Sequence, residues 1–172
     1  MFGIQIPWHN STKYLGVTFD EKLTWREHVE HCTNKAHSTA GRLYPLLGRK
    51  SELSLRNKLR LYKSTIRPQM LYSAPVWGIA APTHMKRLEV KQNKTMSLIT
   101  NAPWYVKNAT IRKDAKMPTL SEVIRNIATR LYEKMATHSS PQIRDVSSAT
   151  ATQTLKYKRL VQVLQNTVTR DT

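Results

Sequence analysis

Lysine and arginine are the residues whose number and spacing could do chemistry in this chain, and that chemistry is phosphate binding. The 172 residues include 28 Lys and Arg against 11 Asp and Glu, for a formal net charge of +17. Such an imbalance indicates a polyanionic partner, of which nucleic acid is the usual one and an acidic membrane surface the weaker alternative. A solvated basic face is the other interpretation, but solvated faces usually mix both signs of charge.

Cations recur at helical spacing in two groups, which we call the first and second basic ridges. The first ridge consists of Arg56, Arg60, Lys63 and Arg67. The second ridge consists of Arg87, Lys91 and Lys94. Each cation of the first ridge follows a residue of an apolar stripe by one position, about 100° around a helix. That stripe consists of Leu55, Leu59, Tyr62 and Ile66. No acid occurs between Leu53 and Leu88, so we expect the ridges to contact phosphates.

Carboxylates and metal ligands are too scattered to predict catalysis or a metal site. Asp20 and Glu21 are the only adjacent acids in the chain. A predicted helix carries His28, His31, Cys32 and His37. Their spacing matches no zinc finger, and a structural zinc site needs four converging ligands. We therefore interpret the histidines as polar positions beside an apolar stripe, and expect no metal and no cofactor in this chain.

The cellular setting can be inferred only in outline. Cys32 is the single cysteine, so no internal disulfide forms and nothing indicates an oxidising compartment. The chain has no apolar run of about 18 residues, and its first residues lack the basic and apolar regions of a signal peptide. We expect an intracellular protein that does not enter a membrane.

The predicted elements are one hairpin and several helices. Alternation predicts strands over residues 2–6 and 13–19, joined by a turn over 7–12. Gly16 falls inside the second strand, where glycine often marks a bulge or the close approach of a backbone or ligand. Because a lone hairpin is marginal in water, we expect it to belong to a larger sheet.

Apolar residues at steps of three and four predict four main helices. These run over residues 24–47, from Ser51 or Ser54 to 67, over 84–100 and over 120–137. Thr24 with Glu27, and Thr119 with Glu122, have the T-x-x-E spacing of a capping box. Pro68 is expected to end or bend the second helix.

Three further features concern aromatic residues and the end of the chain. Trp77 is best interpreted as a core anchor, with base stacking as the alternative. Trp104 and Tyr105 either pin the loop at 101–107 to the bundle or stack on bases. Residues 139–154 are rich in Ser, Thr and Ala and predict a linker, and 157–168 a short basic helix.

Several segments resemble the reverse transcriptases of jockey-like non-LTR retrotransposons. YLGV at 14–17, followed by an acidic turn and LTWREHV, resembles the primer-grip hairpin and first thumb helix. Four later segments resemble the rest of the thumb of that family: LRNKLRLYKSTIRPQMLYSAPVWG at 55–78, QNK at 92–94, APWYVKN at 102–108 and MPT at 117–119. The agreement covers about residues 13–137. Ser73 stands where the family usually has Gly, and the chain after about residue 139 matches poorly.

The resemblance implies a mainly α fold. Residues 1–20 would form the hairpin at the end of the palm, and 21–138 a thumb-like bundle of about four helices. Residues 139–172 would be a poorly ordered or short-helical tail. By resemblance to the primer grip, Tyr14, Leu15 and Gly16 would place the primer 3′ end.

The resemblance also implies a function, the C-terminal part of an RNA-directed DNA polymerase that binds RNA/DNA primer–template. The family's chemistry needs two Mg²⁺ ions held by palm aspartates, one of them in a Y/F-x-D-D turn. This chain has no such pair, and the palm and fingers would lie upstream. We therefore expect the chain alone to incorporate no nucleotide, and expect a nuclear location if it serves a retroelement.

Two other interpretations remain open. One is an autonomous basic helical nucleic-acid-binding protein derived from such an element. The other is a protein-interaction module that presents its basic face to an acidic protein. Binding to an RNA–DNA hybrid separates these two.

Overall fold

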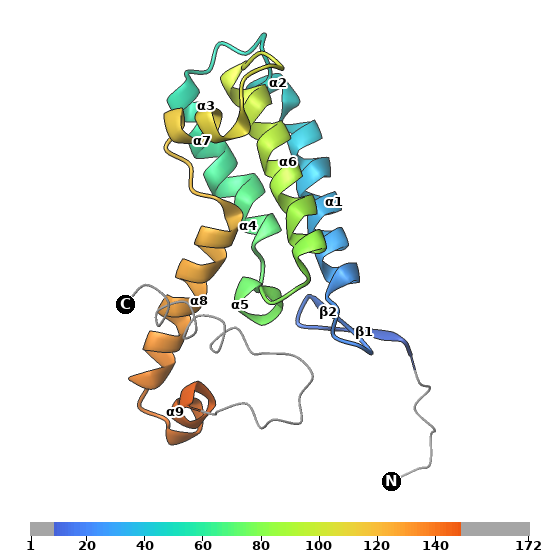
Figure 1. The fold of residues 1–172 in the computed structure, drawn as a ribbon, viewed down its shortest axis with the longest axis vertical. Helices are drawn as coiled ribbons and strands as arrows, with labels where there is room; N and C mark the ends of the chain where they lie inside the picture. Colours follow the sequence, from blue (N-terminus) through green and yellow to red (C-terminus); the bar gives the residue numbers. More distant parts are fainter. Residues whose placement is uncertain (1–8, 149–172) are drawn as a thin grey trace.

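The computed structural model describes residues 9–148, which form a β-hairpin and a bundle of helices (Figure 1). The hairpin pairs β1 (Ser11–Tyr14) with β2 (Val17–Asp20). The longest helices are α1 (Arg26–Arg42), α6 (Pro82–Thr100) and α8 (Leu120–Ala136). The shorter ones are α2 (Tyr44–Leu47), α3 (Leu55–Leu61), α4 (Arg67–Met70), α5 (Ala74–Trp77), α7 (Asn108–Asp114) and α9 (Pro141–Ser148). The predicted fold class, mainly α with an N-terminal hairpin, is confirmed.

The hairpin lies entirely within residues 11–20, so the prediction of one strand over 13–19 is wrong. Tyr14 pairs with Val17 across a two-residue turn. Both turn residues, Leu15 and Gly16, have positive φ, at 46° and 79°. Two positive φ values define the turn whose twist suits a two-residue hairpin, and glycine adopts them freely. The predicted strand at 2–6 lies outside the described residues.

Helix α1 begins with a different cap from the predicted one. The carboxylate of Asp20 accepts hydrogen bonds from the backbone N–H of Thr24 (2.7 Å), the hydroxyl of Thr24 (2.7 Å) and the N–H of Trp25 (2.8 Å). Trp25, with φ 62°, is the residue before the helix, so Thr24 is one position too early for a capping box with Glu27. Burial raises the pKa of Asp20, but these hydrogen bonds outweigh it and leave that pKa below its usual value.

The second predicted capping box is confirmed at the start of α8. The backbone N–H of Thr119 donates to a carboxylate oxygen of Glu122 at 2.8 Å. In return the N–H of Glu122 donates to the hydroxyl of Thr119 at 3.2 Å. Two amide groups that have no partner inside the helix are thereby satisfied.

A composite rod replaces the predicted second helix. Helix α3 runs without interruption through a π-helical stretch, Tyr62–Ile66, into α4. The N–H of Arg67 bonds to the carbonyl of Tyr62, five residues back, which widens the backbone just before Pro68. Pro68 follows directly in α4, where the widened backbone accommodates its ring although the rod loses one N–H donor. The rod therefore continues to Met70 rather than ending near Arg67.

The core lies between the composite rod, α1, α6 and α8, and Trp77 is fully buried in it as predicted. A chain of polar groups crosses this core. The hydroxyl of Tyr62 donates to the side-chain oxygen of Gln92 at 3.2 Å, and the Gln92 amide donates to the Pro118 carbonyl at 3.2 Å. Burial raises the pKa of Tyr62 to about 12. These bonds join the rod and α6 to the connection before α8.

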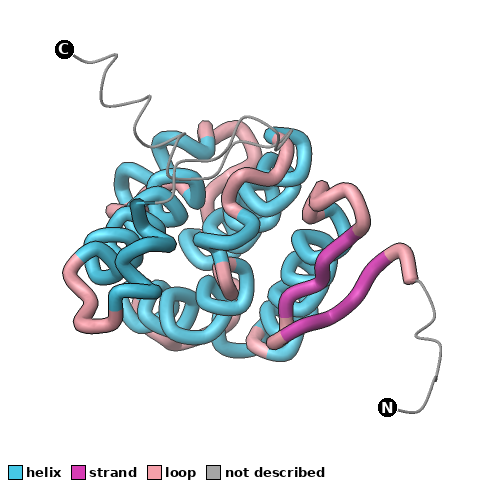
Figure 2. Tube along the Cα trace, turned by 90° about the horizontal axis from the view of Figure 1, so that it is seen from below, coloured by secondary structure: helices cyan, strands magenta, loops and turns pink. Residues whose placement is uncertain are grey.

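The hairpin packs beside the start of α1, as the view from below shows (Figure 2). His28 makes this contact: its ring nitrogen Nδ1 accepts the N–H of Thr18 at 3.3 Å. The ring lies 5.8 Å from that of Trp77 and has no exposed surface. The interpretation of His28 as a polar position beside the stripe is therefore wrong, while His31 and His37 are exposed.

The end of the described chain differs from the prediction in one respect. Residues 141–148 form α9 inside the predicted linker, and α9 packs against α8. The predicted basic helix at 157–168 lies outside the described residues. Within residues 9–148 we find no helix both long enough and apolar enough to cross a membrane.

Candidate nucleic-acid interface

Three cations of the first ridge line one hollow. The exposed side chains of Arg56, Arg60 and Lys63 on α3 and the π-helical stretch face the connection between α7 and α8. With Lys116 they line a hollow of about 390 Å³, in which Asp114 is the one acidic lining residue. Among the described residues we find no ion pair to the three ridge cations. Their charge is therefore available to a ligand.

Arg60 and Lys63 also line a second, more open depression on the other side of the ridge. Its volume is about 810 Å³, and its apolar lining comes from Leu46, Leu53 and Leu61. Arg60 and Lys63 therefore lie between the two depressions and line both of them. A linear polyanion bound along the first ridge can reach these two cations from either depression.

The fourth cation of the first ridge, Arg67, lies in a different environment. Its side chain is half-buried, and its Nε has no hydrogen-bond partner among the described residues. Burial lowers the pKa of the Arg67 guanidinium, and the nearby Tyr62 opposes that shift. Arg67 is the least accessible member of the ridge.

Two residues of α3 exchange the positions expected from periodicity. Leu55 was predicted on the buried stripe but is 48% exposed and lines the hollow beside Arg56. Lys58 is buried instead, and its ammonium donates to the Gly48 carbonyl at 2.8 Å. Lys58 therefore holds the loop before α3, while the ridge cations stay exposed.

The second ridge lies at a separate hollow. Arg87 and Lys91 line about 430 Å³ between α1 and α6, together with Lys86 and the acid Glu30. Lys94 is exposed farther along α6. The second ridge faces α1, because its helix α6 packs mainly on α1. The first ridge faces the connection between α7 and α8 instead.

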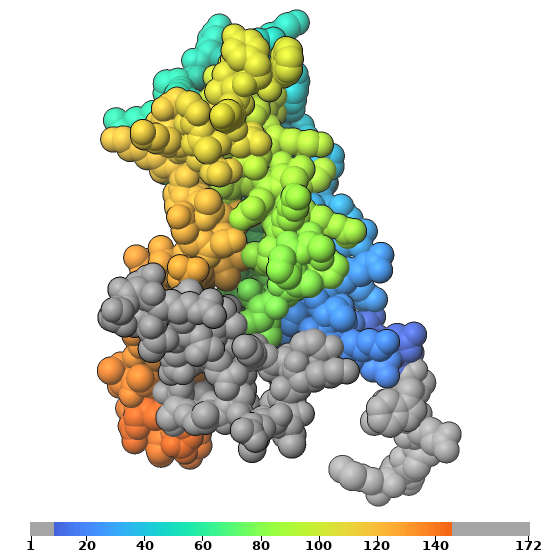
Figure 3. All heavy atoms as spheres, viewed as in Figure 1, coloured from blue at the N-terminus to red at the C-terminus, as the bar shows by residue number. Residues whose placement is uncertain are grey.

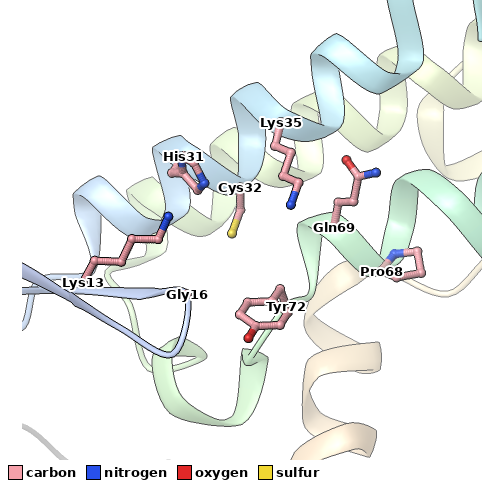
Figure 4. Close-up of a pocket in the computed structure, with 8 residues that line it drawn as sticks. All are labelled: Lys13, Gly16, His31, Cys32, Lys35, Pro68, Gln69 and Tyr72. Atoms are coloured by element: carbon pink, nitrogen blue, oxygen red, sulfur yellow. The ribbon is translucent and has the colours of Figure 1, made fainter. Parts of the chain in front are cut away.

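The hairpin turn borders a third hollow, of about 470 Å³, between β1, α1 and α4 (Figure 4). Lys13, His31 and Lys35 extend into it from the hairpin and α1, and its lining contains no acid. Cys32 also lines it, but burial raises the pKa of that thiol to about 11. The thiol therefore stays protonated near neutral pH and is not a nucleophile.

The three predicted primer-grip residues form the end of β1 and its turn. Tyr14 and Leu15 are 66% and 75% exposed. Gly16 is needed for the turn itself, since its φ is 79° and a Cβ there would lie 3.1 Å from the ring of Tyr72. The hydroxyl of Tyr72 in turn donates to the Leu15 carbonyl at 2.8 Å.

Comparison with known proteins identifies the family. Over 135 residues the chain is 36% identical to the probable RNA-directed DNA polymerase from transposon X-element of Drosophila melanogaster, which covers 78% of this chain. It is 34% identical over 147 residues to the polymerase from mobile element jockey of the same species, covering 86% of this chain. The chain belongs to the jockey-like family of non-LTR reverse transcriptases. The resemblance found in the sequence is thereby confirmed.

A third relative extends the match to most of this reverse transcriptase chain. The probable RNA-directed DNA polymerase from transposon BS of Drosophila melanogaster is 33% identical over 162 residues, or 94% of this chain. The chain spans only 15%, 16% and 18% of the lengths of these three relatives. No protein-family model and no solved structure matches it.

Sequence reasoning missed two residues that shape these reverse transcriptase surfaces. Tyr72 holds the hairpin turn, and Lys116 completes the hollow of the first ridge. A tyrosine inside the apolar run 70–78 was a usable signal, because its ring packs while its hydroxyl seeks a partner. Lys116 belongs to a basic stretch, but only the fold brings it opposite α3.

The described residues do not fit the metal pair that reverse transcription requires. Within residues 9–148, no three His, Cys, Asp or Glu side chains gather closely enough to hold a metal ion. The carboxylate of Asp20, half of the only adjacent acidic pair, already accepts three hydrogen bonds. We therefore derive no metal-dependent step from the described residues.

Proposed function

We propose that this part of the polymerase holds an RNA/DNA primer–template duplex by its phosphates, with Arg56, Arg60 and Lys63 as the principal contacts. The observation that carries the proposal is the exposed, unpaired state of these three cations around one hollow. The names of the relatives, RNA-directed DNA polymerases, indicate a substrate in which RNA and DNA strands are paired. Phosphate contacts position such a duplex without reading its sequence.

The other predicted contact residues do not all touch the same phosphates in this proposal. Arg67 is half-buried and adds positive potential rather than a direct contact. Arg87, Lys91 and Lys94 serve a separate stretch of nucleic acid, because Arg87 and Lys91 line the hollow next to α1.

The hairpin turn is proposed to contact the primer 3′ end. Tyr14 and Leu15 are the exposed side chains there, while Gly16 permits the turn and the approach of Tyr72. Lys13 and Lys35 in the adjacent hollow supply positive charge for the same strand. The palm and fingers are the proposed partners of this part, with the Mg²⁺ ions held by the palm, and this chain alone is expected to incorporate no nucleotide.

The experiment is a salt titration of the 172-residue chain against a blunt RNA–DNA hybrid carrying a fluorescent label. Each phosphate contact contributes about 0.9 to the slope of log affinity against log salt on duplex DNA. The double variant Arg60→Ala, Lys63→Ala should therefore bind more weakly, with a slope shallower by about 1.8.

The control variant removes the same charge from another helix. Arg125 and Arg130 are exposed on α8 and line none of the three basic hollows described above. Arg125→Ala with Arg130→Ala should keep most of the slope. Equal slopes for the two double variants would contradict the assignment of contacts to α3, and no binding by the wild type would contradict the function itself.

A further inference from the structure

Two aromatic side chains at one end of the bundle have no role in the core. Trp104 is 95% exposed and Tyr105 70% exposed, in the loop that joins α6 to α7. Their rings contact each other edge to face, with centroids 5.9 Å apart. The interpretation that they pin the loop to the bundle is therefore wrong. The two rings leave a large apolar area in contact with water, which a ligand could cover.

The loop holds these rings in a defined position. Asn101, with φ 55°, ends α6, and the backbone N–H of Ala102 donates to the Ser97 carbonyl at 3.2 Å. The N–H of Val106 donates to the Pro103 carbonyl at 3.1 Å. The side chains of Ala102 and Val106 pack against the core on either side of the rings. The pair is thus presented from a fixed base.

The surface around the rings is positively charged. The loop after α2 lies at the same end of the bundle (Figure 3), and the guanidinium of its Arg49 donates to the side-chain oxygen of Asn101. Lys50 and Lys107 are exposed on the same two loops, on which Glu52 is the one acid. Exposed aromatics among cations fit single-stranded nucleic acid, whose bases stack while its phosphates are neutralised. A protein partner of neutral surface would leave these cations unpaired.

We propose that Trp104 and Tyr105 form a stacking platform for unpaired bases of the strand that leaves the duplex held on the first ridge. The platform rests on the proposed function, since the ridge must hold the duplex. Helix α7 begins just after the platform and ends beside the first-ridge hollow at Asp114. Its seven residues span about 10 Å, roughly three nucleotide steps of a stacked strand. Bases inside a duplex have their faces covered by the neighbouring stacked pairs, so the platform selects unpaired bases.

The experiment compares a blunt RNA–DNA hybrid with the same hybrid carrying a single-stranded RNA overhang, using the full chain. Wild type should prefer the overhang, and Trp104→Ala should lose about tenfold in affinity for it while keeping its affinity for the blunt hybrid. Trp104→Phe, which can still stack, should keep most of the preference but lose part of the quenching of tryptophan emission. Leu131→Ala, which removes an exposed apolar side chain on α8, is the control and should bind both as wild type does.

The outcomes separate the two proposals. If Trp104→Ala binds the overhang as tightly as wild type, the stacking platform is overturned, whatever the blunt hybrid does. Equal losses on both substrates also overturn it, because they indicate a general defect. If wild type ignores the blunt hybrid but binds the overhang through Trp104, the duplex proposal fails. The placement of the platform beside a held duplex then fails with it, and only stacking of unpaired bases on Trp104 is retained.

Discussion

The hydroxyl of Tyr72 donates a 2.8 Å hydrogen bond to the carbonyl oxygen of Leu15, across 57 positions of the chain. This bond joins the tip of the hairpin to the segment between α4 and α5. The ring of Tyr72 also lies against Gly16, where no side chain would fit without adjustment. The hairpin and the rod that carries the first ridge are therefore coupled through one side chain.

Replacing Tyr72 by Phe removes the hydrogen bond and keeps the ring. Because Tyr72 is half-exposed, water replaces part of the lost bond, and the free energy of unfolding should fall by about 0.5–1 kcal/mol. Amide hydrogen exchange in β1 and β2 should become faster than in wild type. Tyr105→Phe, at an exposed hydroxyl, is the control, and the coupling is refuted if the two variants give the same hairpin exchange rates.

Gly16 and Gly41 should respond to alanine with opposite signs. At Gly16 the φ of 79° is unfavourable for alanine and the new Cβ meets Tyr72, so unfolding should become easier by about 1–2 kcal/mol. Gly41 lies near the end of α1 with nothing within 4 Å of a Cβ, so alanine there should stabilise by about 0.5–1 kcal/mol. Urea denaturation measures both. A gain in stability at Gly16 would show that the turn is not built as described.

Replacing Ser73 by glycine should stabilise the folded chain. Its φ of 55° and ψ of 27° lie in the left-handed region, which costs a side-chain-bearing residue about 1–2 kcal/mol. Glycine avoids that cost but loses more backbone entropy on folding, so Ser73→Gly should gain up to about 1 kcal/mol. Ser64→Gly, within the rod, should instead lose about 0.5–1 kcal/mol, and thermal denaturation that ranks the two variants the other way would contradict this account.

His28 should make the fold sensitive to acid. Burial lowers its pKa below the usual 6.5. A hydrogen bond from the ring to the backbone carbonyl of Tyr72 partly opposes this shift, and the charges of His31 and Lys13 reinforce it. As pH falls through about 6.5, the unfolded chain therefore binds the proton before the folded one does. The contribution of His28 to the free energy of unfolding is fully present above that pH and declines below it.

The measurement is the thermal midpoint between about pH 7.5 and about pH 5.5, for wild type and His28→Gln. The variant is expected to be less stable at the higher pH and to lose less on acidification. Parallel curves for the two proteins would assign the acid sensitivity to other groups.

Periodicity and capping rules were enough for the main helices. The apolar steps located α1, α6 and α8, and the Thr119–Glu122 pair correctly marked the start of α8. These predictions depend on residues within one or two turns of each other, so the sequence contains the whole signal. The exposure of Arg56, Arg60 and Lys63 was found in the same way, from the apolar stripe beside them, whereas the partial burial of Arg67 was not.

The hairpin and the cap of α1 could not be predicted in this way. Both depend on non-glycine residues with positive φ, namely Leu15, Leu23 and Trp25, which no propensity favours. The three hydrogen bonds accepted by Asp20 offset the cost of this backbone geometry at the start of α1. At the hairpin turn, the hydrogen bond from Tyr72, distant in sequence, does the same. Likewise, the separation of the two ridges follows from how α6 packs, not from the spacing of the cations.

The most direct test of the central claim, that the first ridge holds nucleic acid, is a lysine footprint. The chain is acetylated with and without a blunt RNA–DNA hybrid, and the modified lysines are quantified by mass spectrometry. Lys63 and Lys116, which line the first-ridge hollow, should be protected by the hybrid, while the exposed Lys134 on α8 should react equally in both samples. Protection of Lys134 with none at Lys63 and Lys116 would contradict the account.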